Sequence, residues 1–164
     1  MTVLDADVDP LALERQVCFA LATTNRAVLA VYRPLLEPLG LTHPQYLVML
    51  ALWDHHRGDK SGRPLSVKQI AASLQLDSAT LSPMLKRLEA LGLITRTRSA
   101  SDERATDVAL TKAGMVLRRK ALEIPSAVIE RLGVGLAELE HLHTVLTRIN
   151  RAALAAGALE GERA

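Results

Sequence analysis

The chain of 164 residues has few aromatic side chains and a single cysteine. Phe, Trp and Tyr together make up 2% of the sequence, whereas the whole hydrophobic class makes up 49%. We therefore expect one domain with an aliphatic core of Leu, Ala and Val packed between helices, and not a sheet-rich domain. The lone cysteine excludes a disulfide framework within the chain.

The sequence also lacks membrane segments and the common catalytic motifs. No run of 18 apolar residues occurs and the acidic start MTVLDADVDP is unlike a signal peptide, so a cytoplasmic protein without membrane contact is expected. A glycine-rich phosphate loop, a paired carboxylate site and a nucleophile with an evident base are all missing, so neither an enzyme nor a cofactor is predicted. The pairs His55/His56 and His141/His143 point in different directions on a helix, which argues against a metal site.

Positive charge is concentrated in the middle of the chain. The net charge of the whole chain is only +2, but nine Lys or Arg stand against five Asp or Glu between Arg57 and Arg104. This segment therefore carries +4 and the remainder −2. A basic segment of this kind is expected to bind a polyanion such as a nucleic acid.

Two short helices are predicted within this basic segment. Ser66 can cap an amphipathic helix over Val67–Leu74, whose apolar residues recur at spacings of 3, 4 and 7. Asp77 or Ser78 can cap a second helix. Pro83 lies past the first turn of the second helix, where it removes one backbone hydrogen bond and predicts a bend or a helix boundary. The buried stripe of the second helix is expected to consist of Leu81, Leu85 and Leu88.

The opposite face of the second helix is polar. Small hydroxyl side chains near its start can approach base edges or phosphates, and the cations that follow can neutralise the DNA backbone. We therefore predict that this face enters the major groove through Ser78, Thr80, Ser82, Lys86 and Arg87.

A charged hairpin follows the helix pair. Two extended segments, Leu93–Arg98 and Ala105–Leu110, are joined by SASDER. Arg96 is expected to contact a phosphate, and Arg104, steadied by Asp102, to enter the minor groove. A solvated surface hairpin is the alternative, but the adjoining helix pair favours the wing of a winged helix-turn-helix.

Helices are also expected on both sides of residues 64–110. A periodic helical segment within Leu11–Leu36, expected to end near Pro34, and a helix over about Pro44–Trp53 precede the motif. After it, Thr111 can cap a helix that Pro125 kinks or breaks.

The expected fold is mainly α with a small β-hairpin. The helices within 11–56 and 111–156, the last over about Leu136–Leu154, present apolar faces that lack a partner in so small a monomer. These faces suggest an intertwined homodimer, with an ordinary intrachain core as the alternative. Their apolar residues are Val17, Leu21, Val28 and Val31 near the start and Leu139, Leu142, Leu146 and Ile149 near the end.

Several motifs resemble those of one family of bacterial regulators. The segments LDSATLSPMLKRLEALGLITR and SASDERATDVALTKAG are similar to those of the MarR family over about Leu13–Leu154. Within that family, CFAL at Cys18, YRPLLEPLGLTHPQY from Tyr32 to Tyr46, LDSATLSPMLKRLE and the EIP from Glu123 to Pro125 look most like the one-cysteine OhrR type, which senses organic hydroperoxides. The resemblance implies a dimeric repressor that binds a pseudo-palindromic double-stranded operator and carries a thiol switch.

The switch implied by this resemblance depends on Cys18. A thiolate attacks the hydroperoxide and becomes a sulfenic acid, which a small thiol or further oxidation must then convert, because the chain has no second cysteine. In OhrR-type repressors, tyrosines partly supplied by the partner subunit hydrogen-bond the sulfur. Tyr32 matches one of them, whereas Ala22 and His43 stand where two others are usual. His43 can donate, and when protonated would favour the thiolate more than a phenol does, but Ala22 cannot.

Three other interpretations remain open. A lone cysteine on an apolar helix is often an inert core residue, and a repressor released by a small aromatic, acidic ligand does not need Cys18. A thiol peroxidase would use Cys18 but gains nothing from the hairpin. A helical interaction module would show no salt-dependent affinity for a duplex.

Overall fold

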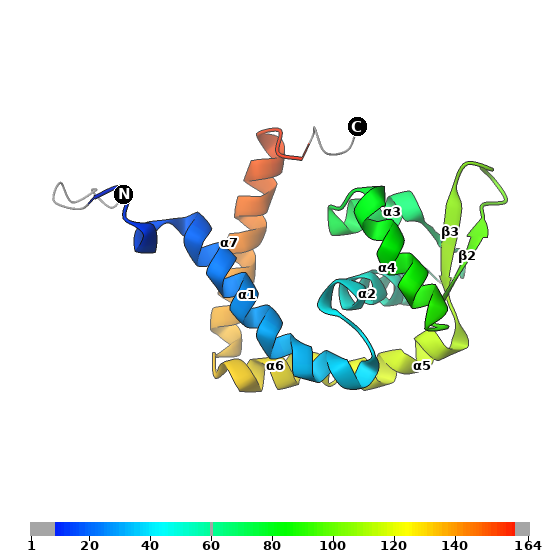
Figure 1. Ribbon diagram of the computed structural model, residues 1–164, viewed down its shortest axis with the longest axis horizontal. Coiled ribbons are helices and arrows are strands. Elements are labelled where there is room, and N and C mark those ends of the chain that lie inside the picture. Colours follow the sequence, from blue (N-terminus) through cyan, green and yellow to red (C-terminus); the bar gives the residue numbers. More distant parts are fainter. Residues whose placement is uncertain (1–8, 60, 160–164) are drawn as a thin grey trace.

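The computed structural model describes residues 9–59 and 61–159 and is mainly helical, with one small antiparallel sheet. In chain order the elements are η1 Leu13–Arg15, α1 Val17–Leu36, η2 Glu37–Leu39, α2 His43–Gly58, β1 Leu65–Ser66, α3 Val67–Leu74, α4 Ser78–Ala90, β2 Ile94–Arg98, β3 Thr106–Leu110, α5 Lys112–Ala121, α6 Ile124–Leu132 and α7 Leu136–Ala155. Figure 1 shows that they form an open arch: α7 stands on one side, α5 and α6 run along the base, and α3, α4 and the β2–β3 hairpin form the other side around α2.

Side-chain caps begin most of the helices near the sheet. Ser66 accepts a hydrogen bond from the Gln69 amide while the Gln69 side chain accepts one from the Ser66 amide, which completes a capping box. Asp77, and not Ser78, caps α4. Thr111 caps α5 by accepting from the Gly114 amide, as expected from the sequence.

Two prolines do not end their helices, which corrects the expected boundaries. Pro83 lies inside a continuous α4, and Pro34 lies inside α1, which continues to Leu36. Helix α4 tolerates the lost hydrogen bond because burial of Leu81 before Pro83 and Leu85 after it holds both parts of the helix against the core. Pro125 does mark a break, since it lies in the first turn of α6 after α5 has ended.

The sheet has three strands, so the expected two-stranded hairpin was incomplete. β1 pairs antiparallel with β3 through Leu65 and Val108, and β2 pairs with the other edge of β3, giving the order β1-β3-β2. The short β1 ends at Ser66, the residue that caps α3. The sheet thus fixes the start of the helix pair relative to the hairpin.

The core lies around α2, α3, α4 and the sheet, while the terminal helices are largely bare. Helix α7 has no buried residue, and Leu142, Leu146 and Ile149 remain exposed along it. Val17 and Leu21 are exposed on α1. Within residues 9–59 and 61–159, no helix combines the length and apolar composition needed to cross a bilayer.

Candidate DNA-binding surface and thiol site

Helix α4 presents most of the predicted contact residues to solvent. Ser78, Thr80, Lys86 and Arg87 are exposed, whereas Ser82 is half-buried. The opposite side of the helix is fully packed, because Leu81, Leu85 and Leu88 are at most 1% exposed. The polar face and the core face therefore lie where the sequence pattern predicted them.

Thr80 serves the cap of α4 as well as its surface. Its amide donates to Asp77 Oδ1 and its hydroxyl to Asp77 Oδ2, both at 2.7 Å. These two hydrogen bonds hold the pKa of Asp77 below its usual value. The hydroxyl of Thr80 keeps its acceptor lone pairs free for an incoming donor.

Arg96 is held by a carboxylate that the sequence analysis had not singled out. Its guanidinium donates to Glu89 Oε2 through Nη2 at 2.6 Å and through Nε at 3.0 Å, and its amide donates to Oε1 at 3.2 Å. The hydrogen bonds from Arg96 lower the pKa of Glu89. This ion pair joins α4 to β2, so Arg96 has a structural partner besides the phosphate predicted for it.

Asp102 orders the tip of the hairpin through backbone bonds. Its Oδ1 accepts from the amide of Arg104 at 3.0 Å, and its carbonyl accepts from the amide of Ala105 at 2.9 Å. The sequence had predicted that Asp102 steadies the Arg104 side chain. In the structure the carboxylate shapes the turn from which the exposed Arg104 side chain extends.

One chain does not bring Cys18 close to the other predicted redox residues. Cys18 is exposed in the first turn of α1, whereas Tyr32 lies near its far end. Fourteen residues of α-helix separate them, a rise of about 21 Å. Tyr32 and His43 pack edge to face with ring centroids 4.9 Å apart, and Tyr46 lies beside both. A hollow of about 600 Å³ opens beside His43, between Leu29 and Arg33 of α1 and the start of α2.

Burial sets the protonation of this aromatic cluster. It raises the pKa of Tyr32, which keeps its hydroxyl proton, and lowers the pKa of His43. The protonated imidazole considered from the sequence is therefore disfavoured near neutral pH. In its neutral form His43 has one ring N–H to donate.

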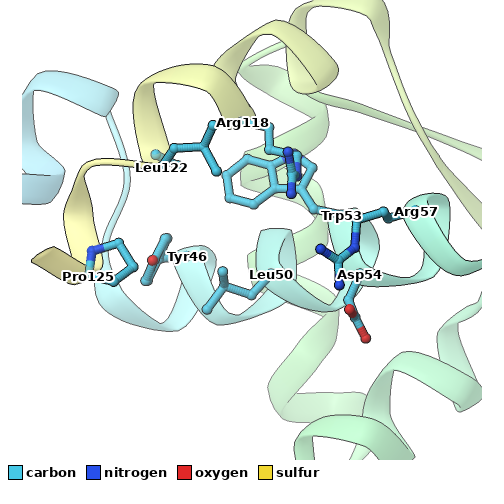
Figure 2. Close-up of a pocket in the computed structure, with 9 residues that line it drawn as sticks. Tyr46, Leu50, Trp53, Asp54, Arg57, Arg118, Leu122 and Pro125 are labelled. Carbon is cyan, nitrogen blue, oxygen red and sulfur yellow. The ribbon is translucent and has the colours of Figure 1, made fainter. Parts of the chain in front are cut away.

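A second hollow, of about 240 Å³, lies between α2 and the α5–α6 junction. Figure 2 shows Trp53 and the guanidinium groups of Arg57 and Arg118 on one side and Tyr46 with Pro125 on the other. Trp53 donates from Nε1 to the Gly114 carbonyl at 2.9 Å, which fixes the ring. The lining combines aromatic side chains with two cations and one carboxylate, Asp54, and this excess of positive charge suits a flat anionic molecule.

Comparison with known proteins identifies the family. Residues 30–120 match the model of the transcriptional regulators SarA/Rot. The chain is 42% identical over 147 residues to the organic hydroperoxide resistance transcriptional regulator of Bacillus subtilis (strain 168), covering 87% of this chain and 95% of that relative. The chain belongs to the MarR family. The OhrR-like resemblance expected from the sequence is thereby confirmed.

Solved structures of MarR-family regulators share the fold. Reduced AbfR bound to DNA matches with a TM-score of 0.70 and 30% identity, covering 87% of this chain and 94% of that one. Overoxidised AbfR bound to DNA and a disulfide form of AbfR match with TM-scores of 0.66 and 0.60. The repressor CouR on a 23-mer DNA duplex matches with a TM-score of 0.73 and 26% identity over 88% of this chain and 99% of that one. The predicted winged helix-turn-helix fold is confirmed.

The sequence analysis missed a pair of amides that links distant parts of this MarR-family chain. Gln75 Nε2 donates to Asn150 Oδ1 and Asn150 Nδ2 donates to Gln75 Oε1, both at 3.1 Å. Neither residue belongs to a local motif, and 75 positions separate them. Within residues 9–59 and 61–159, no group of three or more His, Cys, Asp or Glu side chains is placed to hold a metal ion.

Proposed function

We propose that this chain is a homodimeric transcriptional repressor that leaves its operator when an organic hydroperoxide oxidises Cys18. The observation that carries the proposal is the exposed thiol on an apolar face of α1, in a chain 42% identical to a regulator of organic hydroperoxide resistance. The AbfR structures support it, since reduced, overoxidised and disulfide forms are known for that similar protein.

The dimer places two α4 helices on one duplex. They read a pseudo-palindrome whose half-site centres lie about 10 bp, or a multiple of that distance, apart. Arg104 at each hairpin tip enters the minor groove and Arg96 reaches a phosphate while it stays paired with Glu89. The major-groove face consists of Ser78, Thr80, Ser82, Lys86 and Arg87.

The thiol site is completed across the dimer. The distance along α1 keeps Cys18 away from the aromatic cluster of its own chain, so the partner subunit's Tyr32 and His43 are the donors available to the sulfur. Their O–H and N–H groups stabilise a thiolate by hydrogen bonding, which does not require a charged imidazole. The exposed apolar residues of α1 and α7 form the interface that brings the two chains together.

Oxidation at Cys18 proceeds in two steps, formation of a sulfenic acid and then of a mixed disulfide. The thiolate attacks the terminal oxygen of the hydroperoxide, the O–O bond breaks, and the alkoxide leaves and takes up a proton to become the alcohol. The sulfur, now a sulfenic acid, reacts with a small thiol to form a mixed disulfide and water. The added group is larger than the thiolate and cannot accept the same hydrogen bonds, so we expect the donors from the partner subunit to rearrange.

Fluorescence anisotropy with the chain's own upstream DNA tests this function. The reduced protein is titrated with an organic hydroperoxide in the presence of a small thiol, beside a Cys18→Ser variant. We expect the wild type to release the duplex and the variant to stay bound. Release of both proteins, or of neither, contradicts the thiol switch. Peroxide consumption beyond one equivalent per chain would instead indicate a thiol peroxidase.

The hollow beside Trp53 favours one second candidate, a repressor released by a small aromatic acid. Arg57 and Arg118 provide the positive charge and Tyr46 and Trp53 the flat surface for such a ligand. In the same assay, aromatic carboxylates such as benzoate and salicylate would then release wild type and Cys18→Ser alike. An Arg118→Gln variant would need a higher concentration of the acid for release.

A further inference from the structure

Helix α7 is hydrogen-bonded to the DNA-binding elements through the side chains of Asn150 and Gln75. No residue of α7 is buried, and among the described residues its only side-chain hydrogen bonds to another element are the two that Asn150 exchanges with Gln75. Figure 1 shows α7 standing across the open arch from α3 and α4. The amide pair therefore spans the two sides of the arch.

Gln75 is tightly fixed to the start of the recognition helix. It ends α3 in the left-handed conformation with φ of 55°, which is rare for a residue other than glycine. The amide of Leu76 donates to the Ala71 carbonyl at 2.9 Å, and Asp77, the next residue, caps α4. Only two positions separate Gln75 from Asp77, the cap of α4. A displacement of Gln75 therefore also displaces the first turn of α4.

Asn150 lies at the border of the exposed apolar face of α7. It follows Ile149 directly and lies one turn beyond Leu146, and both of these residues are exposed. Residues one turn apart share a face of a helix, so Asn150 borders the surface available to a second copy of the chain. A shift or rotation of α7 in the dimer moves Asn150 with it.

We infer that the Gln75–Asn150 pair is a brace that positions the recognition helix relative to α7 and thereby sets the separation of the two α4 helices in the dimer. We class Gln75 and Asn150 as positioning residues, because neither belongs to the predicted DNA-contact set or to the proposed thiol site. The inference rests on the proposed function and deepens it by naming residues that determine which half-site spacing the repressor accepts.

The chemistry of the pair makes this role specific. Each amide contributes one donor and one acceptor, so alanine at either position removes both hydrogen bonds. The double variant Gln75→Asn with Asn150→Gln keeps both donors, both acceptors and the total side-chain length. It is therefore the conservative replacement that should restore function. Thr147→Ala is the matched control on an exposed position of α7.

The test measures preference for half-site spacing. Operator duplexes with the native spacing are compared with duplexes lengthened or shortened by 1 bp, which rotates one half-site by about 34°. We expect Asn150→Ala to bind the native operator about fivefold more weakly and to distinguish the spacings by less than about twofold, as two lost hydrogen bonds per chain would allow. Thr147→Ala and the exchanged double variant should keep the selectivity of the wild type.

Two results overturn the brace. One is an Asn150→Ala protein as selective as the wild type; the other is an exchanged double variant no more selective than Asn150→Ala. Failure of the wild type to bind any upstream duplex contradicts the proposed function instead. In that case hydrogen exchange decides, because a brace predicts faster exchange at the Leu76 and Leu81 amides in Asn150→Ala than in Thr147→Ala, and equal rates refute it.

Discussion

Replacing Gly114 with alanine should destabilise the junction between α5 and the start of the hairpin. Gly114 is buried in the first turn of α5, and a Cβ at this position would lie well under 3.0 Å from the carbonyl oxygen of Leu93. The obstacle is backbone, which cannot turn aside as a flexible side chain can. The Leu93 carbonyl must move by roughly 1 Å to restore an ordinary contact.

Two hydrogen bonds depend on the position of this backbone. The Leu93 carbonyl accepts from the Thr111 amide at 3.0 Å, and the Gly114 carbonyl accepts from Trp53 Nε1 at 2.9 Å. Overpacking of a filled core costs about 2 kcal/mol, and weakening one of these bonds adds about 1 kcal/mol. We therefore expect Gly114→Ala to lower the free energy of unfolding by about 3 kcal/mol, which lowers Tm by about 6–12 °C for a chain of this length.

Urea and thermal unfolding at one fixed protein concentration measure this loss, because the stability of a dimer depends on concentration. Gly58→Ala is the control, since its Cβ would meet nothing within 4 Å and its φ is not positive. That change should leave stability unchanged or raise it by up to about 1 kcal/mol. A Gly114→Ala protein as stable as the Gly58→Ala protein would refute the steric reasoning.

Two further predictions concern charge. Lys86→Ala should make the slope of log K against log salt less steep by about 1.8 per dimer, because two phosphate contacts are lost. Arg96→Ala should change the slope less, because Glu89 already pairs with that guanidinium. Equal slopes for the two variants in anisotropy titrations would contradict this difference. The pKa of Asp77 is lowered by its hydrogen bonds from Thr80, so its stabilisation is complete above the ordinary aspartate pKa of about 3.9 and is lost as the pH falls below that value toward the folded-state pKa. Asp77→Asn keeps a good cap but does not titrate, and its urea midpoint should fall less than that of the wild type between pH 5 and pH 3.

Features of the fold that depend on neighbouring residues were predictable from the sequence. The starts of α3, α4 and α5 follow from a cap, which needs only a side chain and an amide three residues away. The caps are Ser66, Asp77 and Thr111. The apolar stripe of α4 follows from helical periodicity alone. Pro83 misled the boundary prediction, since the packing that keeps α4 continuous comes from other elements.

Features that join distant residues were not predictable. β1 is too short for a strand pattern and exists because Leu65 pairs with Val108, more than forty residues away. In the sequence Glu89 is indistinguishable from an ordinary surface charge, because its partner Arg96 is brought close only by the packing of β2 against α4. The distance between Cys18 and Tyr32, by contrast, could have been worked out from the sequence, since both lie on one predicted helix.

A continuous set of contacts runs from the aromatic cluster to the hairpin. His43 lies in the first turn of α2, and Trp53 of the same helix is hydrogen-bonded to Gly114 at the start of α5. Thr111, which caps α5, donates through its amide to the Leu93 carbonyl and through its hydroxyl to the Gly92 carbonyl at 2.6 Å. These residues lie at the base of the hairpin, so a rotation of α2 has a route to the DNA-binding surface that does not pass through α1 or α7. Such a route is rigid at each step, because each link is either a helix or a hydrogen bond to backbone.

The Gln75–Asn150 brace reaches α4 from the opposite side. The recognition helix and the hairpin are therefore held from both sides of the arch, and under the proposed function a displacement of either support changes their position on DNA.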